Sequence, residues 1–211
     1  MKTAIIIGAT GLVGSTLAEQ ILENPNYSKV VLLVRKPLEI SHPKLVQEII
    51  NFDKPDATKI MGDDLFCAMG TTLKKAGSKE AQYKIDCTYP YEIGKIAKQN
   101  GIKQYILVSS IGADFSSSNF YLKTKGDLEQ KIQALGFDNF VSLRPSFILG
   151  DRQEFRLGEK IGIVLAKILS PLMIGGLRKY RGVEASKIAQ KMQQCANQGL
   201  TGVHFVESDK I

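Results

Sequence analysis

The sequence has few residues that bind metals or form disulfides, and it has no long apolar run. Its cysteines, Cys67, Cys87 and Cys195, are odd in number, far apart and in no Cys-x-x-Cys pair, which argues against a disulfide framework or a zinc site. His42 and His204 are isolated, so we expect no metal site. No stretch reaches the roughly 18 uninterrupted apolar residues of a membrane span, and the first apolar run is too short for a secretory signal. These absences predict a cytoplasmic protein with no membrane span.

Basic residues outnumber acidic ones, with 28 Lys and Arg against 21 Asp and Glu and a net charge of +7. The lysines are scattered along the chain rather than clustered with aromatic residues, so we expect no nucleic-acid partner. A solvated surface suited to anionic ligands is the better interpretation of this charge.

The strongest motif stands at the start of the chain, where the apolar residues 4–7 run into three regularly spaced glycines. Gly8 lets the chain leave a strand tightly, Gly11 removes a side chain where a pyrophosphate approaches, and Gly14 lets the next helix pack on the strand. That helix offers free N–H groups and a positive dipole end to phosphates. The same glycine spacing also serves plain packing. We predict a dinucleotide-binding turn formed by Gly8, Thr10, Gly11, Leu12, Val13 and Gly14.

Strands and helices alternate along the rest of the chain. Apolar runs predict strands at residues 29–34, 47–52, 65–69, 104–108, 139–143 and 203–206. Helical periodicity and stop signals predict helices at residues 78–99, 119–135, 161–169 and 184–197. Such alternation requires parallel pairing with right-handed crossovers. We therefore expect an α/β fold, a doubly wound parallel sheet (Rossmann fold) with helices on both faces. It forms a single domain, residues 1–211, with a small substrate-side lid segment at residues 150–182.

Ligands of such sheets bind beyond the carboxyl ends of the strands, so the residues that follow each strand are candidates for the site. Arg35 and Lys36 follow the second strand, where an NAD-binding protein carries a carboxylate for the ribose 2′-OH. Two cations suit a 2′-phosphate instead, which predicts NADP as cofactor, with NADPH preferred over NADH. The alternative is a pair of solvated surface cations.

Two further strand ends supply candidate cofactor contacts. Asn51 and Phe52 end the third strand and are placed to border an adenine, although a phenylalanine here is more often simply core. Gly70 and Thr71 follow the fourth strand. They would bring backbone and a hydroxyl group to the ribose side of the cofactor.

The fifth strand runs into Ser109 and Ser110, and Tyr121 and Lys125 follow on a predicted helix. Positions i and i+4 share a helix face, so the phenol and the ammonium can point at one cofactor. A free phenol has a pKa of about 10, so proton transfer near pH 7 requires a neighbouring cation that stabilises the phenolate. Ser110 would orient the carbonyl or hydroxyl group of a substrate. We predict Ser110, Tyr121 and Lys125 as catalytic residues, the alternative being a structural tyrosine near a salt-bridging lysine.

Two other patterns are interpreted as structural. A second Tyr-x-x-x-Lys copy, Tyr91 to Lys95, precedes the fifth strand and has no serine-bearing strand end before it. Asp63 and Asp64 are expected in a solvated turn before the fourth strand. Neither pattern is a candidate for the site.

Five stretches of the sequence resemble a known family. They are Gly8-Ala-Thr-Gly-Leu-Val-Gly14, Met69-Gly-Thr-Thr-Leu-Lys-Lys-Ala-Gly-Ser78, Val108-Ser-Ser-Ile-Gly-Ala-Asp114, Tyr121-Leu-Lys-Thr-Lys-Gly126 and Leu143-Arg-Pro-Ser-Phe-Ile-Leu-Gly-Asp-Arg152. Together they resemble the atypical short-chain dehydrogenase/reductase superfamily, and within it the Tat-interacting-protein-like NAD(P)-binding proteins. The resemblance implies that Ser110, Tyr121 and Lys125 take the Ser/Tyr/Lys roles and that the turn at Pro145 borders the nicotinamide. It weakens after Arg152, where substrate specificity would reside.

The sequence thus predicts an NADP(H)-dependent oxidoreductase acting on a small carbonyl or alcohol substrate. The alternative is an NADPH-binding regulatory or partner-binding protein in which the same residues hold cofactor without turnover. A nucleotide-sugar epimerase is disfavoured, because the chain after Arg152 is too short for the usual sugar-binding lobe. The sequence predicts no particular oligomeric state.

Overall fold

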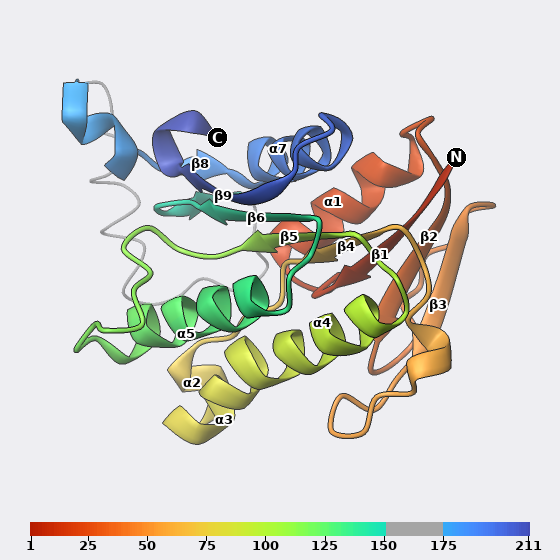
Figure 1. The fold of residues 1–211 in the computed structure, drawn as a ribbon, viewed down its shortest axis with the longest axis horizontal. Helices are drawn as coiled ribbons and strands as arrows, with labels where there is room; N and C mark the ends of the chain where they lie inside the picture. The colour runs from red at the N-terminus through yellow and green to blue at the C-terminus, as the bar shows by residue number, and fades with distance from the viewer. Residues whose placement is uncertain (151–174) are drawn as a thin grey trace.

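The computed structural model describes residues 1–150 and 175–211, and a parallel sheet of seven strands forms its centre (Figure 1). The strand order is β3-β2-β1-β4-β5-β6-β9, and every neighbouring pair is parallel. The strands are β1 Lys2–Ile7, β2 Tyr27–Val34, β3 Leu45–Ile49, β4 Asp64–Cys67, β5 Gln104–Val108, β6 Asn139–Arg144 and β9 Gly202–Glu207. The predicted doubly wound parallel sheet is confirmed.

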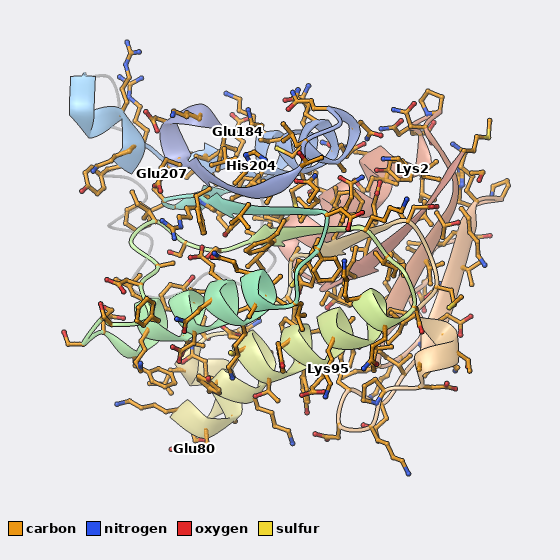
Figure 2. All side chains as sticks on the ribbon, viewed as in Figure 1. Lys2, Glu80, Lys95, Glu184, His204 and Glu207 are labelled. Atoms are coloured by element: carbon orange, nitrogen blue, oxygen red, sulfur yellow. The ribbon has the colours of Figure 1, made fainter. Side chains whose placement is uncertain are left out.

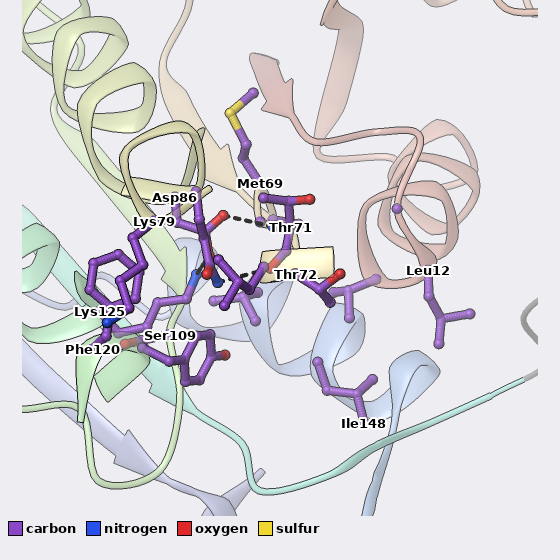
Figure 3. A pocket seen from close by; sticks show the side chains of 18 of the residues that line it. Leu12, Met69, Thr71, Thr72, Lys79, Asp86, Ser109, Phe120, Lys125 and Ile148 are labelled. Carbon is purple, nitrogen blue, oxygen red and sulfur yellow. Dashed lines mark hydrogen bonds and ion pairs between the residues drawn. The ribbon is translucent and has the colours of Figure 1, made fainter. Parts of the chain in front are cut away.

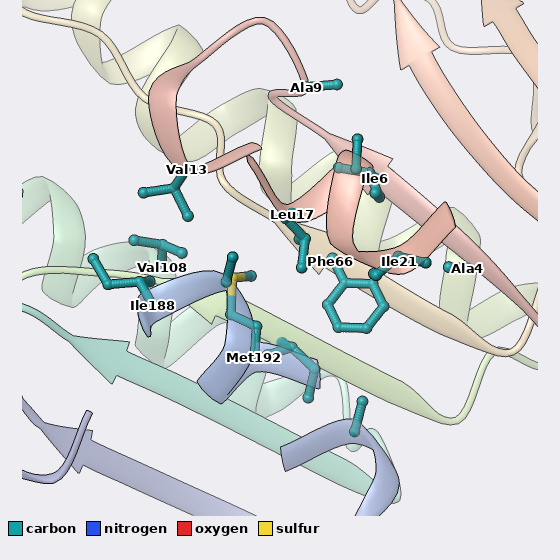
Figure 4. Packing of buried hydrophobic residues seen from close by; sticks show 14 of the residues in the cluster. Ala4, Ile6, Ala9, Val13, Leu17, Ile21, Phe66, Val108, Ile188 and Met192 are labelled. Carbon is teal, nitrogen blue, oxygen red and sulfur yellow. The ribbon is translucent and has the colours of Figure 1, made fainter. Parts of the chain in front are cut away.

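Helices cover both faces of the sheet because its strands are apolar on both sides. Along β1, Ala4 and Ile6 face a cluster with α1 (Leu12–Leu22) and α7 (Ala185–Asn197). Ile5 and Ile7 face a second cluster with α4 (Tyr89–Gln99) and α5 (Phe120–Ala134). Figure 4 shows the first cluster, where side chains of α1 lie beside those of α7. The alternation of side chains along each strand therefore determines which helices a strand residue packs against.

The predicted helix at residues 78–99 is continuous but changes geometry along its length. Ser78 caps α3 (Lys79–Tyr83), accepting a hydrogen bond from the Ala81 N–H. A π-helical turn, η2 (Lys84–Thr88), then leads directly into α4. The short helix α2 (Leu73–Ala76), capped by the Thr72 hydroxyl, precedes them and was not predicted. Two 3-10 turns, η1 (Ala57–Lys59) and η5 (Ser208–Lys210), complete the regular elements around the main sheet.

A second sheet of two strands pairs the segment just before residues 150–182 with the segment just after them. It pairs β7 (Ile148–Leu149) with β8 (Val183–Glu184), and the 3-10 helix η4 (Gly175–Tyr180) precedes β8. The predicted helix at residues 161–169 and most of the predicted lid segment lie outside the described residues. The lid therefore stays a prediction. No helix in the described part of the chain is long and apolar enough to cross a membrane.

The prediction of a solvated Asp64 is wrong. β4 begins at this residue, between β1 and β5, and its side chain is 1 % exposed. Its carboxylate accepts hydrogen bonds from the Tyr27 hydroxyl at 2.6 Å, the Lys2 ammonium at 3.0 Å and the Gln104 amide at 2.8 Å. Lys2 lies at the amino-terminal edge of the sheet (Figure 2), the edge opposite the predicted site. The strand position buries Asp64, and its three donors satisfy the buried charge.

Candidate active site

A cavity of about 480 Å³ opens at the carboxyl ends of β1, β4 and β5 (Figure 3). Its walls are the glycine turn, the loop after β4, η2 and the start of α5. The predicted site residues that line it are Gly11, Leu12, Val13, Gly70, Thr71, Tyr121 and Lys125. The structure thus brings the predicted cofactor turn and the predicted catalytic pair to one hollow.

The glycines of the turn fall into two groups. Gly8 has φ +87°, and a Cβ there would meet the Ala68 carbonyl carbon at 2.5 Å. A Cβ at Gly14 would clash with the Gly8 carbonyl oxygen. Both glycines therefore permit close packing behind the cavity, whereas Gly11 lines the cavity itself and caps α1. Thr10 is exposed next to this turn and is not among the lining residues.

Tyr121 and Lys125 lie on one face of the first turns of α5. The Asn119 side chain caps this helix by accepting a hydrogen bond from the Leu122 N–H. Lys125 is 4 % exposed and Tyr121 is 39 % exposed, and the ammonium lies 5.9 Å from the centroid of the phenol ring. The i, i+4 spacing thus places a buried cation beside a phenol that opens to the cavity.

A buried carboxylate that the sequence analysis missed completes this cluster. Asp86 in η2 is 0 % exposed, and its Oδ2 lies 3.8 Å from the Lys125 Nζ. Burial by itself lowers the pKa of Lys125, but the Asp86 charge, with smaller contributions from Tyr121 and two thiols, raises it above its usual value. The signal was present in the sequence, because Asp86 shares a helix face with the buried Ile93 and Ala97.

The serine that lines the cavity is Ser109, whereas the sequence analysis assigned the hydroxyl role to Ser110. Ser109 is 5 % exposed, and within the described part of the chain its Oγ has no hydrogen-bond partner. Ser110 is not among the lining residues, and its Oγ donates to the Ile111 carbonyl at 3.3 Å. Tyr105 and Leu107 belong to the α4 and α5 cluster, and Ser109 continues their alternation. An orphaned hydroxyl on the α5 side of the sheet is thus available to a ligand.

The remaining predicted cofactor residues lie outside the cavity lining. Arg35 and Lys36 follow β2 directly and are exposed, and neither forms an ion pair or hydrogen bond with a described residue. Asn51 is exposed and accepts a hydrogen bond from the Asp53 N–H. Phe52 is 7 % exposed and packs in the α4 and α5 cluster. It is a core residue, which was the alternative interpretation from the sequence.

Arg144 and Glu129 tie β6 to the helix that carries the predicted catalytic pair. Glu129 of α5 is 3 % exposed and accepts two hydrogen bonds from the Arg144 guanidinium, at 2.6 and 3.0 Å. It also accepts one from the Ser142 hydroxyl at 2.7 Å. Pro145 follows Arg144, is buried, and accepts the Ile111 N–H at its carbonyl. Arg144 at the end of β6 thus ties this strand to α5, and Pro145 ties it to the loop after β5.

A family model described as NAD(P)H-binding matches residues 8–161. The chain belongs to this NAD(P)H-binding family. Protein HTATIP2 of Rattus norvegicus is 40 % identical over 164 residues, covering 75 % of this chain and 67 % of that protein. Protein FMP52, mitochondrial, of Candida albicans is 35 % identical over 210 residues, covering 95 % and 90 %. The resemblance to Tat-interacting-protein-like members of the atypical short-chain dehydrogenase/reductase superfamily is confirmed.

Solved structures share the fold of this family member at low sequence identity. MoeE5 in complex with UDP-glucose and NAD has a TM-score of 0.73 at 14 % identity, covering 96 % of this chain and 74 % of that chain. Bordetella bronchiseptica WbmH in complex with NAD⁺ has a TM-score of 0.71 at 17 % identity, covering 99 % and 76 %. These likenesses show the fold alone.

The prediction of a cytoplasmic protein is contradicted by the relatives. Several of them, from Candida albicans, Coccidioides immitis and Aspergillus niger among others, are named mitochondrial. Free cysteines argue only against an oxidising, secreted environment. They do not separate the cytoplasm from a compartment inside the mitochondrion, which is why the expectation was wrong.

Proposed function

We propose that this NAD(P)-binding protein is an NADP(H)-dependent oxidoreductase that transfers hydride between the nicotinamide and a small carbonyl or alcohol substrate. The convergence of Ser109, Tyr121 and Lys125 in one cavity that continues to the glycine turn carries the proposal. A hydroxyl, a phenol and a buried ammonium are the groups that proton transfer to a carbonyl oxygen requires.

The cofactor is assigned from the fit of the residues. Gly8 and Gly14 allow the turn to pack tightly against backbone, and the lining Gly11 leaves the backbone open to a pyrophosphate. Gly70 passes so close to Lys125 that a Cβ there would lie 3.4 Å from the Nζ, so the loop backbone flanks the cavity. Arg35 and Lys36 are exposed and free of ion pairs with described residues, as a 2′-phosphate site requires.

The residues of the cavity have distinct roles in the reduction direction. NADPH supplies the hydride when it is bound. The Ser109 hydroxyl donates a hydrogen bond to the substrate carbonyl oxygen, which orients the carbonyl beside Tyr121. The Tyr121 hydroxyl donates its proton to that oxygen, and the Lys125 ammonium stabilises the phenolate that forms. Lys125 would also hold the ribose of a bound cofactor, so it would serve both cofactor binding and proton transfer.

Replacing Tyr121 with Phe tests the proposal, because this change removes one hydroxyl and keeps the ring. We expect NADPH oxidation with an active aldehyde, ketone or quinone to fall by about 10² to 10⁴, the range of a lost general acid. The NADPH dissociation constant should stay within about threefold. Steady-state absorbance assays and cofactor titration provide the two measurements.

Tyr91→Phe is the matched control, because Tyr91 stands in the second Tyr-x-x-x-Lys copy on α4. It should leave turnover unchanged. If the wild type binds NADPH but oxidises it with no carbonyl in the panel, and Tyr121→Phe changes nothing, the regulatory alternative replaces the enzyme.

A further inference from the structure

We propose that Asp86 is a positioning residue for Lys125, holding the ammonium beside Tyr121 and tying it to the Gly70–Thr71 loop. This inference rests on the proposed function, since it assigns Lys125 its counter-ion in the same cavity. Asp86 itself is not required to touch substrate or cofactor.

The contacts of Asp86 connect three segments that are distant in sequence. Its Oδ2 faces the Lys125 Nζ of α5 at 3.8 Å, and its Oδ1 accepts the Thr71 N–H at 2.6 Å. Both side chains of the ion pair are nearly inaccessible, at 5 % exposed for Lys125 and 0 % for Asp86. A charge buried to this extent is stable only with a partner. The Asp86 carboxylate is therefore the counter-ion that permits burial of the Lys125 ammonium.

The helix that carries Asp86 departs from regular geometry at this position. η2 is π-helical over Lys84–Thr88, between the α-helical segments α3 and α4, and it packs against α5. Single π turns inside α-helices are rare and occur frequently at functional sites. The irregular turn thus lies where the helix meets Lys125.

The cavity reaches this ion pair from the side of the loop after β4. Gly70, Asp86 and Lys125 all line it, and Figure 3 labels the two charged side chains. A Cβ at Gly70 would lie 3.4 Å from the Lys125 Nζ and 3.9 Å from both Asp86 carboxylate oxygens. Asp86 accepts the Thr71 N–H and also faces Lys125. A shift of this loop would therefore move the Asp86 carboxylate relative to the Lys125 ammonium. The geometry couples the loop on the predicted ribose side to Lys125.

The charge on Lys125 depends on Asp86 more than on any other neighbour. The titratable groups that act on it are Asp86 from η2, Tyr121 from α5, Cys67 from β4 and Cys87 from η2. Burial raises the pKa of both thiols, which stay neutral near pH 7. Without the Asp86 carboxylate, burial would lower the pKa of Lys125. A neutral Lys125 would neither stabilise a phenolate nor bind ribose as a cation.

The test replaces Asp86 with Asn, which keeps the shape of the side chain and removes its charge. The titration of Lys125 is followed by NMR on protein labelled at the lysine Cε, without cofactor, and its signal is assigned by its absence in Lys125→Met. In the wild type we expect no titration of Lys125 below about pH 10. In Asp86→Asn we expect a titration between about pH 6 and 9, since buried lysines without a counter-ion titrate that low.

NADPH titrations of the same proteins test whether the pair serves the cofactor. From one pH unit below to one pH unit above the Lys125 midpoint measured in Asp86→Asn, the dissociation constant of that variant should rise about tenfold as Lys125 loses its proton, whereas the wild-type constant should change less than about threefold over the same range. Asp53→Asn is the matched control. Asp53 forms an exposed ion pair with Lys84, which lies in the same helical turn as Asp86. The control should leave both readouts at wild-type values.

Asp86→Asn leaves a buried ammonium unpaired, and its loss of stability can prevent folding. The double variant Asp86→Asn with Lys125→Met removes both charges and should recover much of that stability, because removing one member of a buried pair costs more than removing both. Failure of the double variant to recover stability would count against the pair.

The possible results separate this inference from the proposed function. An unshifted Lys125 titration in Asp86→Asn would overturn the inference, and so would a shifted titration with pH-independent NADPH affinity. If the wild type binds neither NADPH nor NADH, the proposed function fails. The NMR titration, recorded without cofactor, still decides whether Asp86 holds Lys125 charged.

Discussion

At the scale of single residues, two adjacent serines show how strand geometry determines which hydroxyl group faces the cavity. Ser109 continues the alternation of Tyr105 and Leu107 toward the α4 and α5 side, where Tyr121 and Lys125 lie. Ser110 is outside the cavity lining. A sequence motif with two serines locates the end of the strand. The alternation of side chains along the strand then shows which of the two serines faces the cavity.

We therefore expect Ser109→Ala to lower kcat/KM for an active carbonyl substrate by about 10² to 10³, the effect of losing one donor to a developing oxyanion. Ser110→Ala is the matched control and should stay within about threefold, because its hydroxyl is engaged by the Ile111 carbonyl. Steady-state kinetics of both variants decide the assignment. An equal loss in both, or a larger loss in Ser110→Ala, would contradict it.

Cofactor preference is also a property of single residues. Arg35→Ala should weaken NADPH binding by about ten- to hundredfold, or about 1.4 to 2.8 kcal/mol, because a charge-assisted contact with the 2′-phosphate is lost. NADH binding should change little, since NADH lacks that phosphate. Titration calorimetry with both cofactors measures the difference.

Lys103→Ala serves as its control, because Lys103 is also exposed but precedes β5, at the opposite end of the strands. It removes one positive charge without touching the predicted phosphate site. Equal affinities of the wild type for NADPH and NADH would refute the assignment of Arg35.

At the scale of elements, α5 has to be held in place for Tyr121 and Lys125 to act together. The buried Glu129 accepts hydrogen bonds from Arg144 and Ser142, both on β6, and these bonds anchor the helix. Glu129→Ala should lower the free energy of unfolding by about 2 to 4 kcal/mol, because it leaves the partly buried Arg144 guanidinium without its main partner. Urea unfolding followed by circular dichroism measures this change.

Glu92→Ala is the matched control for that loss. Glu92 forms an ion pair of 3.7 Å with Lys95 on the exposed side of α4, so its removal should cost less than about 1 kcal/mol. Equal losses in the two variants would show that Glu129 does not anchor α5.

The main-sheet strands and the longer helices of the described residues were predictable from sequence, whereas the short elements α2, β7 and β8 and local departures from regular geometry were not. The strand at residues 104–108 and the helix starts near Ser78 and Asn119 follow from local signals, and the structure has them there. The π turn that carries Asp86 has no such signal, because it depends on the packing of η2 against α5. The burial of Asp64 was missed for a related reason: its donors come from β1, β2 and β5.

At the scale of the whole molecule, the parallel sheet explains why scattered motifs form one site. The glycine turn, the loop after β4 and the serine after β5 follow three neighbouring strands, β1, β4 and β5, whose carboxyl ends meet at one edge. This convergence was predictable from the alternation of strands and helices. Arg35 and Lys36 also follow a strand of this edge, but β2 lies beyond β1, which leaves them outside the cavity lining.

The central claim is that this cavity transfers hydride from NADPH to a carbonyl carbon. The most direct test incubates the protein with an active carbonyl substrate and NADPH deuterated at C4, in the 4R and 4S forms separately, and analyses the alcohol product by mass spectrometry. We expect one deuterium on the carbinol carbon from only one of the two forms, since a fixed site presents one face of the nicotinamide. Product without deuterium from either form, or no alcohol product with any carbonyl tested, would contradict the account.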